Sequence, residues 1–167
     1  MSDLIQFCKS LDIEVKMAKQ PFDLKRALEQ LNPDTYQDTL LIIDFSLDGV
    51  VDLQSIGHPE IKSPHGLDAG LCFVEHFLRP AAEPKEGEVS YSNIPIVMFT
   101  NTGSDEGDVK PRVEAINRRA AERRHPRVEL VYKAGEGTPI GDNGRQQFRS
   151  VIESWIKGEW SKEDSSA

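Results

Sequence analysis

The chain is short of cysteine, of long apolar runs and of any export signal, and each shortage excludes a class of protein. Its 167 residues include two cysteines, Cys8 and Cys72, and the opening MSDLIQFCKS has no basic region followed by an apolar stretch. We therefore expect a cytoplasmic protein with reduced thiols rather than a disulfide framework. No apolar run approaches the roughly 20 residues needed to cross a bilayer, so no membrane association is expected.

The composition excludes further classes. Glycine (12) and proline (10) are near ordinary usage and 29% of residues are charged, which excludes collagen, coiled coil and wholesale disorder. The formal net charge of −8 disfavours bulk electrostatic binding to nucleic acid or to anionic membrane. A chain of this length is expected to form one domain, which we place at residues 1–157, followed by a polar tail at 158–167.

Apolar patterning predicts alternating strands and helices. Short β-branched runs predict strands at 13–18, 39–45, 94–100 and 127–132, and the second of these is expected to be buried on both faces. The alternation with helices is typical of an α/β protein, so we expect a doubly wound, mostly parallel sheet of about four to five strands.

Helical spacing of apolar residues predicts the remaining elements, at 22–31, 67–78, 109–120 and 148–156. Asp108 is expected to cap the helix at 109–120, which would place Pro111 in its first turn. The opening segment is expected to form a helix with Leu4, Cys8 and Leu11 facing inward. Trp160 in the tail is expected to pack on the last helix.

Three residues with distinct chemistry stand at predicted strand ends, each followed by a connection longer than usual. Asp44, Thr100 and Lys133 each end one strand. Ligands of open α/β sheets bind at the carboxyl ends of the strands, so we expect these side chains to converge on one pocket. A carboxylate can act as a nucleophile toward phosphorus, a hydroxyl can donate to a phosphoryl oxygen, and an ammonium group can neutralise its charge.

Four segments carry a resemblance to a known family: LLIIDFSL around Asp44, GLDAGLCFVEHFL, IPIVMFTN around Thr100, and VELVYKA around Lys133. In their order and spacing, residues 10–157 resemble the receiver domain of two-component response regulators. The resemblance implies a flavodoxin-like fold and a phosphorelay role rather than an enzyme. Asp44 would take a phosphoryl group from a histidine kinase or phosphotransfer protein with the help of Mg²⁺. Thr100 and Lys133 would sense the product, and a downstream protein partner would receive the signal.

The chain departs from the receiver pattern in ways that bear on metal binding. Receivers open with a strand that ends in an acidic pair, whereas Met1 is followed at once by a helical pattern. An insert of about 16 residues also follows the Asp44 loop, at 50–65. Mg²⁺ would then be held by Asp44, with loop carboxylates as the candidates to replace the pair: Asp48, Asp52 and Asp68.

The missing opening strand lies in the middle of a receiver sheet, and three arrangements remain open. The segment 13–18 pairs directly with 39–45, another chain donates a strand, or the strand lies upstream of Met1. An exposed sheet edge would favour self-association, so a homo-oligomer is left open as well.

Arginines crowd residues 118–127, with Glu122 as the one acid and a local charge of +4. This cluster is either a solvated helix end or a docking surface for an acidic partner, in which case Arg119, Arg123 and Arg124 are its candidate residues. Another set of residues, His58, His65, Cys72 and His76, matches no standard zinc spacing.

The alternatives to a phosphorylated receiver are therefore a phosphorylation-independent pseudo-receiver that acts as a protein-interaction module, and a small α/β enzyme or nucleotide-binding protein with 46–65 as a lid.

Overall fold

A parallel sheet forms the centre of the fold. The computed structural model describes residues 2–45, 53–54, 69–101, 106–133 and 142–160. Its strands are β1 (Leu41–Asp44), β2 (Ile96–Asn101) and β3 (Val128–Lys133), and they lie in the order β1-β2-β3 with both pairings parallel. The structure is therefore mixed α/β with a three-stranded parallel sheet in its described part.

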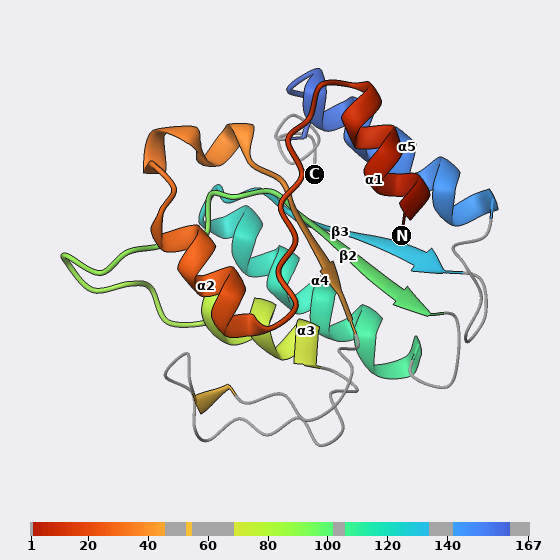
Figure 1. The fold of residues 1–167 in the computed structure, drawn as a ribbon. Coiled ribbons are helices and arrows are strands. Elements are labelled where there is room, and N and C mark those ends of the chain that lie inside the picture. Colours follow the sequence, from red (N-terminus) through yellow and green to blue (C-terminus); the bar gives the residue numbers. More distant parts are fainter. Residues whose placement is uncertain (1, 46–52, 55–68, 102–105, 134–141, 161–167) are drawn as a thin grey trace.

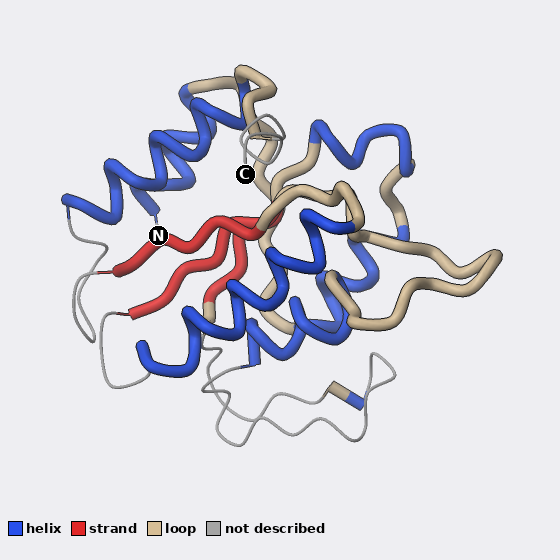
Figure 2. The backbone as a smooth tube through the Cα atoms, turned by 180° about the vertical axis from the view of Figure 1, so that it is seen from behind, coloured by secondary structure: helices blue, strands red, loops and turns tan. Residues whose placement is uncertain are grey.

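Helices cover both faces of this sheet (Figures 1 and 2). On one face lie α1 (Ser2–Ser10) and α5 (Asp142–Ile156). On the other lie α2 (Pro21–Glu29), α4 (Glu106–Glu122) and α3 (Ala69–Phe73), which continues directly into the π-helical turn η4 (Val74–Leu78). A 3-10 helix, η1 (Pro33–Asp38), leads into β1.

Side chains of the central strand β2 alternate between two apolar clusters. Ile96 and Met98 belong to the cluster under α2, α3 and α4, while Val97 and Phe99 belong to the cluster under α1 and α5. All of these side chains are fully buried. This period of two is what a strand produces when both faces of its sheet are covered. The second cluster also contains Trp160, as expected from the sequence.

The expected strand at 13–18 is wrong, because this segment forms no strand and does not pair with β1. It joins α1 to α2, and Ile13 and Val15 pack against the cluster under α1 and α5. The alternation of these two side chains serves that packing, while charged neighbours such as Lys16 remain exposed. Direct pairing of 13–18 with 39–45 is therefore not how the sheet is completed.

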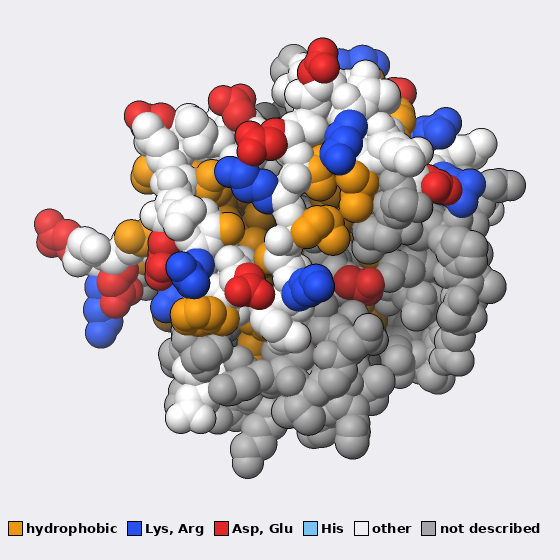
Figure 3. Space-filling view, viewed as in Figure 1, with side chains coloured by type: hydrophobic (Ala, Val, Ile, Leu, Met, Phe, Trp, Pro, Cys, Tyr) orange, Lys and Arg blue, Asp and Glu red, His pale blue; other side chains and the backbone are white. Residues whose placement is uncertain are grey.

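The edge strand β1 is covered less fully than the sequence predicts. The side chain of Ile42, in the middle of β1, is 42% exposed, so the expectation of burial on both faces is wrong. In the described part of the chain β1 pairs with β2 alone, which leaves it at the edge of the sheet. Figure 3 shows apolar side chains on both sides of the segment that joins α1 to α2.

Two helix boundaries also differ from expectation. The first helix ends at Ser10, and Asp12 has a positive φ of 57°, so Leu11 lies in a turn and is 40% exposed rather than buried. The fourth helix begins at Glu106, so Asp108 does not cap it and Pro111 lies inside it rather than in its first turn. No helix in the described residues is both long and apolar enough to cross a membrane.

Candidate functional site

The carboxyl edge of the sheet carries the residues that the sequence selects. In the parallel register Asp44 is level with Phe99, Thr100 with Tyr132, and Asn101 with Lys133. Asp44 and Lys133 therefore stand at the ends of β1 and β3, and Thr100 lies one residue before the end of β2, on neighbouring strands that are spaced about 4.8 Å apart in a sheet. The side chain of Lys133 is outside the described residues.

Strand alternation assigns these positions to different faces. Thr100 continues the series of Ile96 and Met98, toward α2, α3 and α4, and its side chain is 2% exposed. Asp44 alternates with Ile43, whose side chain lies in that same cluster, so Asp44 belongs to the opposite face and is partly exposed. A ligand that contacts both residues would therefore sit over the end of the sheet rather than against one face.

The backbone that follows Asp44 anchors the start of α3. The N–H of Gly70 donates to the carbonyl oxygen of Phe45 at 3.0 Å, and the N–H of Phe45 donates to the carbonyl of Phe99 at 2.7 Å. A Cβ atom at Gly70 would overlap the carbonyl oxygen of Asp44. A glycine is thus required where α3 meets β1. This contact couples any movement of the Asp44 backbone to α3.

Asp44 supplies the minimum number of carboxylates with which proteins bind Mg²⁺. Mg²⁺ in proteins is held by one or two carboxylates together with waters and phosphate oxygens, and Asp44 supplies one carboxylate at the strand end. The loop candidates Asp48, Asp52 and Asp68 lie outside the described residues. Among the residues that are described, no group of three or more His, Cys, Asp and Glu is arranged to hold a metal ion.

Two arginines of the cluster at 118–127 make hydrogen bonds to backbone carbonyls within the protein. Nη2 of Arg119 donates to the carbonyl of Arg79 at 3.5 Å, and Arg123 donates to the carbonyls of Pro80, at 3.0 Å, and Ala81. Arg124 is exposed and has a φ of 57° just after α4. Arg119 and Arg123 therefore hold the chain where η4 ends, a place where cations are favourable.

Arg79 is a functional candidate that the sequence analysis missed. Its side chain is 4% exposed, and its guanidinium donates to backbone carbonyls of Leu78, Tyr91, Ile94 and Pro126. Burial lowers the pKa of Arg79 to about 10, and its Nε has no hydrogen-bond partner in the described structure. The one sequence signal was its position directly after the apolar stripe that ends at Leu78.

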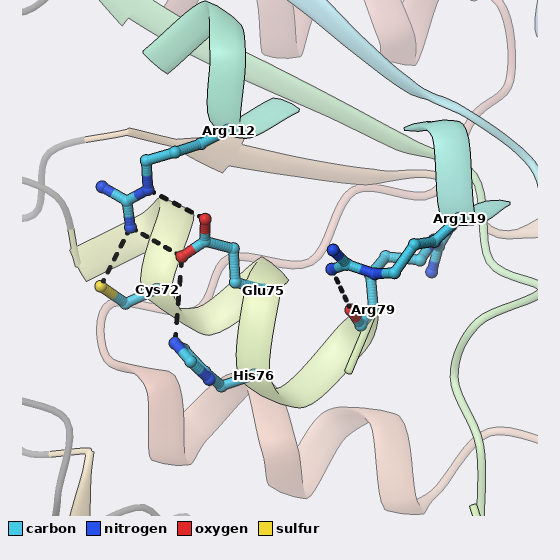
Figure 4. A network of polar contacts seen from close by, with 6 residues as sticks. All are labelled: Cys72, Glu75, His76, Arg79, Arg112 and Arg119. Carbon is cyan, nitrogen blue, oxygen red and sulfur yellow. Dashed lines mark hydrogen bonds and ion pairs between the residues drawn. The ribbon is translucent and has the colours of Figure 1, made fainter. Parts of the chain in front are cut away.

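A second polar network joins η4 to α4 (Figure 4). Arg112 binds Glu75 through two parallel hydrogen bonds, from Nε to Oε1 at 2.9 Å and from Nη2 to Oε2 at 2.7 Å. Nη2 also approaches Sγ of Cys72 at 3.6 Å, and Nε2 of His76 lies 3.9 Å from Oε2 of Glu75. Cys72 and His76 thus surround an ion pair, while His58 and His65 are outside the described residues.

Comparisons with known proteins identify no relative. No family model matches the chain, and neither the curated proteins nor the solved structures contain a match.

Proposed function

We propose that this chain is a receiver-type signalling domain of a two-component phosphorelay, with a flavodoxin-like fold and Asp44 as its phospho-acceptor. The observation that carries the proposal is the parallel register, in which Asp44 and Lys133 end β1 and β3 while Thr100 lies one residue before the end of β2, so that all three lie at the same edge of the sheet. Helices on both faces of a parallel sheet agree with a doubly wound fold. The proposed location is the cytoplasm.

The proposed chemistry assigns one role to each of these residues. A carboxylate oxygen of Asp44 attacks the phosphorus of a phosphohistidine on the kinase or phosphotransfer protein, the P–N bond breaks, and the released imidazole nitrogen takes up a proton. The hydroxyl of Thr100 donates to a phosphoryl oxygen, and the ammonium group of Lys133 balances the new negative charge. Mg²⁺, held by Asp44, supplies further neutralisation of the phosphoryl oxygens when it is bound.

Incubation of the full chain with acetyl phosphate and Mg²⁺ tests this proposal. We expect the mass to rise by one phosphoryl group, and beryllofluoride with Mg²⁺ to shift the amide resonances of Gly70, Thr100 and Lys133. Asp44→Asn should abolish both effects. Asp38→Asn, which removes an exposed carboxylate from the end of η1, is the matched control and should change neither. A wild-type chain that takes up no phosphoryl group at saturating Mg²⁺ would remove the proposal.

A phosphorylation-independent interaction module is the second candidate. The observation that favours it is a groove between η4 and α4 that has Arg119 at one end and does not involve the strand-end residues. This candidate would replace the first if the wild-type chain stayed unphosphorylated while a protein partner bound through Arg119.

A further inference from the structure

A groove of about 630 Å³ lies between η4 and α4, away from the strand ends. Six of its lining residues are apolar, and its polar residues come from the two helices on either side, Glu75 and His76 from η4 and Arg112 and Arg119 from α4 (Figure 4). One wall is a π-helical turn, a rare conformation that is frequently found at functional sites. Pockets of this volume accommodate several side chains of a bound peptide or a small molecule. The apolar lining comprises Pro80, Ala81, Ala82, Pro111, Ala115 and Ile116.

The single carboxylate among the residues that line this groove is already neutralised. Glu75 accepts both hydrogen bonds from Arg112, at 2.9 and 2.7 Å, so this pair contributes little net charge. His76 lines the same wall with its side chain 45% exposed.

The opposite end of the groove keeps a positive charge. Arg119 makes one hydrogen bond at 3.5 Å to the carbonyl of Arg79, and it forms no ion pair with any residue that the structure describes. A carbonyl oxygen does not neutralise a guanidinium, and most of the donors of Arg119 remain available.

A buried charge behind Arg119 strengthens the positive potential. The guanidinium of Arg79 contacts carbonyl oxygens and no carboxylate within the described ranges. A small cavity of about 10 Å³, the size of one water molecule, adjoins the groove and shares Pro80, Ile116 and Arg119 with it. This cavity is also lined by Arg79 and Arg123; Arg123 is paired with Glu83 at 3.5 Å, so the buried charge of Arg79 is the one that adds to Arg119 at this end of the groove.

We infer that this groove is a docking site for an acidic segment of a partner protein, with a carboxylate on Arg119 and a neighbouring aliphatic side chain against the apolar lining residues. The guanidinium of Arg119 can bind a carboxylate through two hydrogen bonds. The small residues Ala82 and Ala115 leave room for the aliphatic side chain. The chain as a whole has a net charge of −8, so an acidic partner is attracted to this surface and repelled by most others, which favours a specific complex.

The lining argues for a peptide rather than a nucleic acid. No phenylalanine, tyrosine or tryptophan is present among the described residues that line the groove, so the imidazole of His76 is the one ring there on which a base could stack. The net negative charge also opposes a polyanion that extends beyond the groove.

Selection from a phage-displayed library of random dodecapeptides on the full chain provides the probe. We expect the enriched peptides to contain aspartate or glutamate next to leucine, isoleucine or another large apolar residue. One enriched peptide, synthesised with a fluorophore, is then titrated with each variant in an anisotropy assay, and urea unfolding verifies that each variant is folded.

Arg119→Glu is expected to weaken the binding of this peptide about tenfold or more. Arg118→Glu is the matched control, because it makes the same charge change at an exposed position of α4 outside the groove, and it should weaken binding less than about threefold. Ala82→Glu adds a carboxylate to the exposed rim without touching the contacts of Arg79, and it should weaken binding even if Arg119→Glu fails to fold.

Asp44→Asn should leave peptide binding unchanged, so the result is independent of the proposed phosphorelay role. The inference is overturned if the enriched peptides lack acidic residues, if Arg118→Glu weakens binding as much as Arg119→Glu, or if Ala82→Glu has no effect. Displacement of the peptide by single-stranded oligouridylate, with loss of oligonucleotide binding in Arg119→Glu, would overturn it in favour of RNA.

Discussion

Gly70 packs so closely against Asp44 that a Cβ atom at Gly70 would overlap the Asp44 carbonyl oxygen. The same glycine donates its N–H to the carbonyl of Phe45 at 3.0 Å. The first turn of α3 is thus joined to the end of β1 by close backbone contacts, in addition to the apolar cluster that both elements share.

Gly70→Ala is therefore expected to destabilise the protein by about 2–3 kcal/mol, because the new methyl group must displace the backbone of β1 or α3. Urea unfolding followed by fluorescence measures the change. Gly87→Ala is the control, since Gly87 has a positive φ of 86° but open space around it, and its cost should be about 1 kcal/mol. Equal losses of unfolding free energy in Gly70→Ala and Gly87→Ala would contradict the close contact between Gly70 and the Asp44 carbonyl.

Arg79→Met should cost about 3 kcal/mol of unfolding free energy. The reason is that buried carbonyls of Tyr91 and Ile94 would lose their donor, while an apolar side chain cannot replace it. Arg118→Met, at an exposed position of α4, removes the same charge and should change stability by less than about 0.5 kcal/mol. Equilibrium denaturation of both variants decides the point, and similar midpoints would show that Arg79 contributes only its charge.

The stability of the protein should fall in mild acid partly because of His125. Burial, followed by the charges of Arg79 and Arg123, lowers the pKa of His125 from 6.5, and Glu83 offsets a part of this. The unfolded chain then binds more protons than the folded one between pH 6.5 and the lowered pKa. The stabilising contribution is therefore complete above pH 6.5 and is lost as the pH falls through the lowered pKa.

Replacement of His125 by glutamine tests whether this imidazole causes the loss of stability in acid. The difference in urea midpoint between pH 7.5 and pH 5 should be smaller for His125→Gln than for the wild type, because glutamine does not titrate. Parallel pH profiles for the two proteins would rule out His125 as a contributor.

Arg124→Gly should stabilise the protein by about 0.5–1 kcal/mol. Arg124 follows α4 with a φ of 57°, and the N–H of His125 donates to the carbonyl of Ala120 across this turn at 2.8 Å, an arrangement in which glycine avoids the strain of a side chain. The matched change Arg118→Gly, inside the same helix, should destabilise by about 1 kcal/mol. Thermal unfolding would contradict this account if both substitutions shifted stability in the same direction.

Periodic elements could be predicted from the sequence because local burial determines them. The stripe of Val109, Val113, Ile116 and Ala120 defines α4, and the apolar run at Ile96 defines β2. The expectation for 13–18 failed because two alternating apolar side chains can pack on helices as well as in a sheet. Neither the shortness of β1 nor the exposure of Ile42 could be predicted, since both depend on which segments pair with it.

Strand-end positions were the predictable part of the candidate site. Asp44, Thr100 and Lys133 could be placed at one edge from the parallel topology alone. The contacts of Arg79 with Tyr91, Ile94 and Pro126 could not be predicted, because they join residues far apart in the sequence. They also involve backbone carbonyls, which every residue has, so the residue types do not reveal them. For the same reason the pairing of Glu75 with Arg112 required the structure.

The position of β2 between the two apolar clusters determines how the protein unfolds. Since β2 contributes fully buried side chains to both apolar layers, neither set of helices can detach without exposing part of the same strand to water. Loss of α1 and α5 would leave Val97 and Phe99 uncovered, and loss of the opposite helices would do the same to Ile96 and Met98. The two halves of the fold should accordingly melt together, as one cooperative unit.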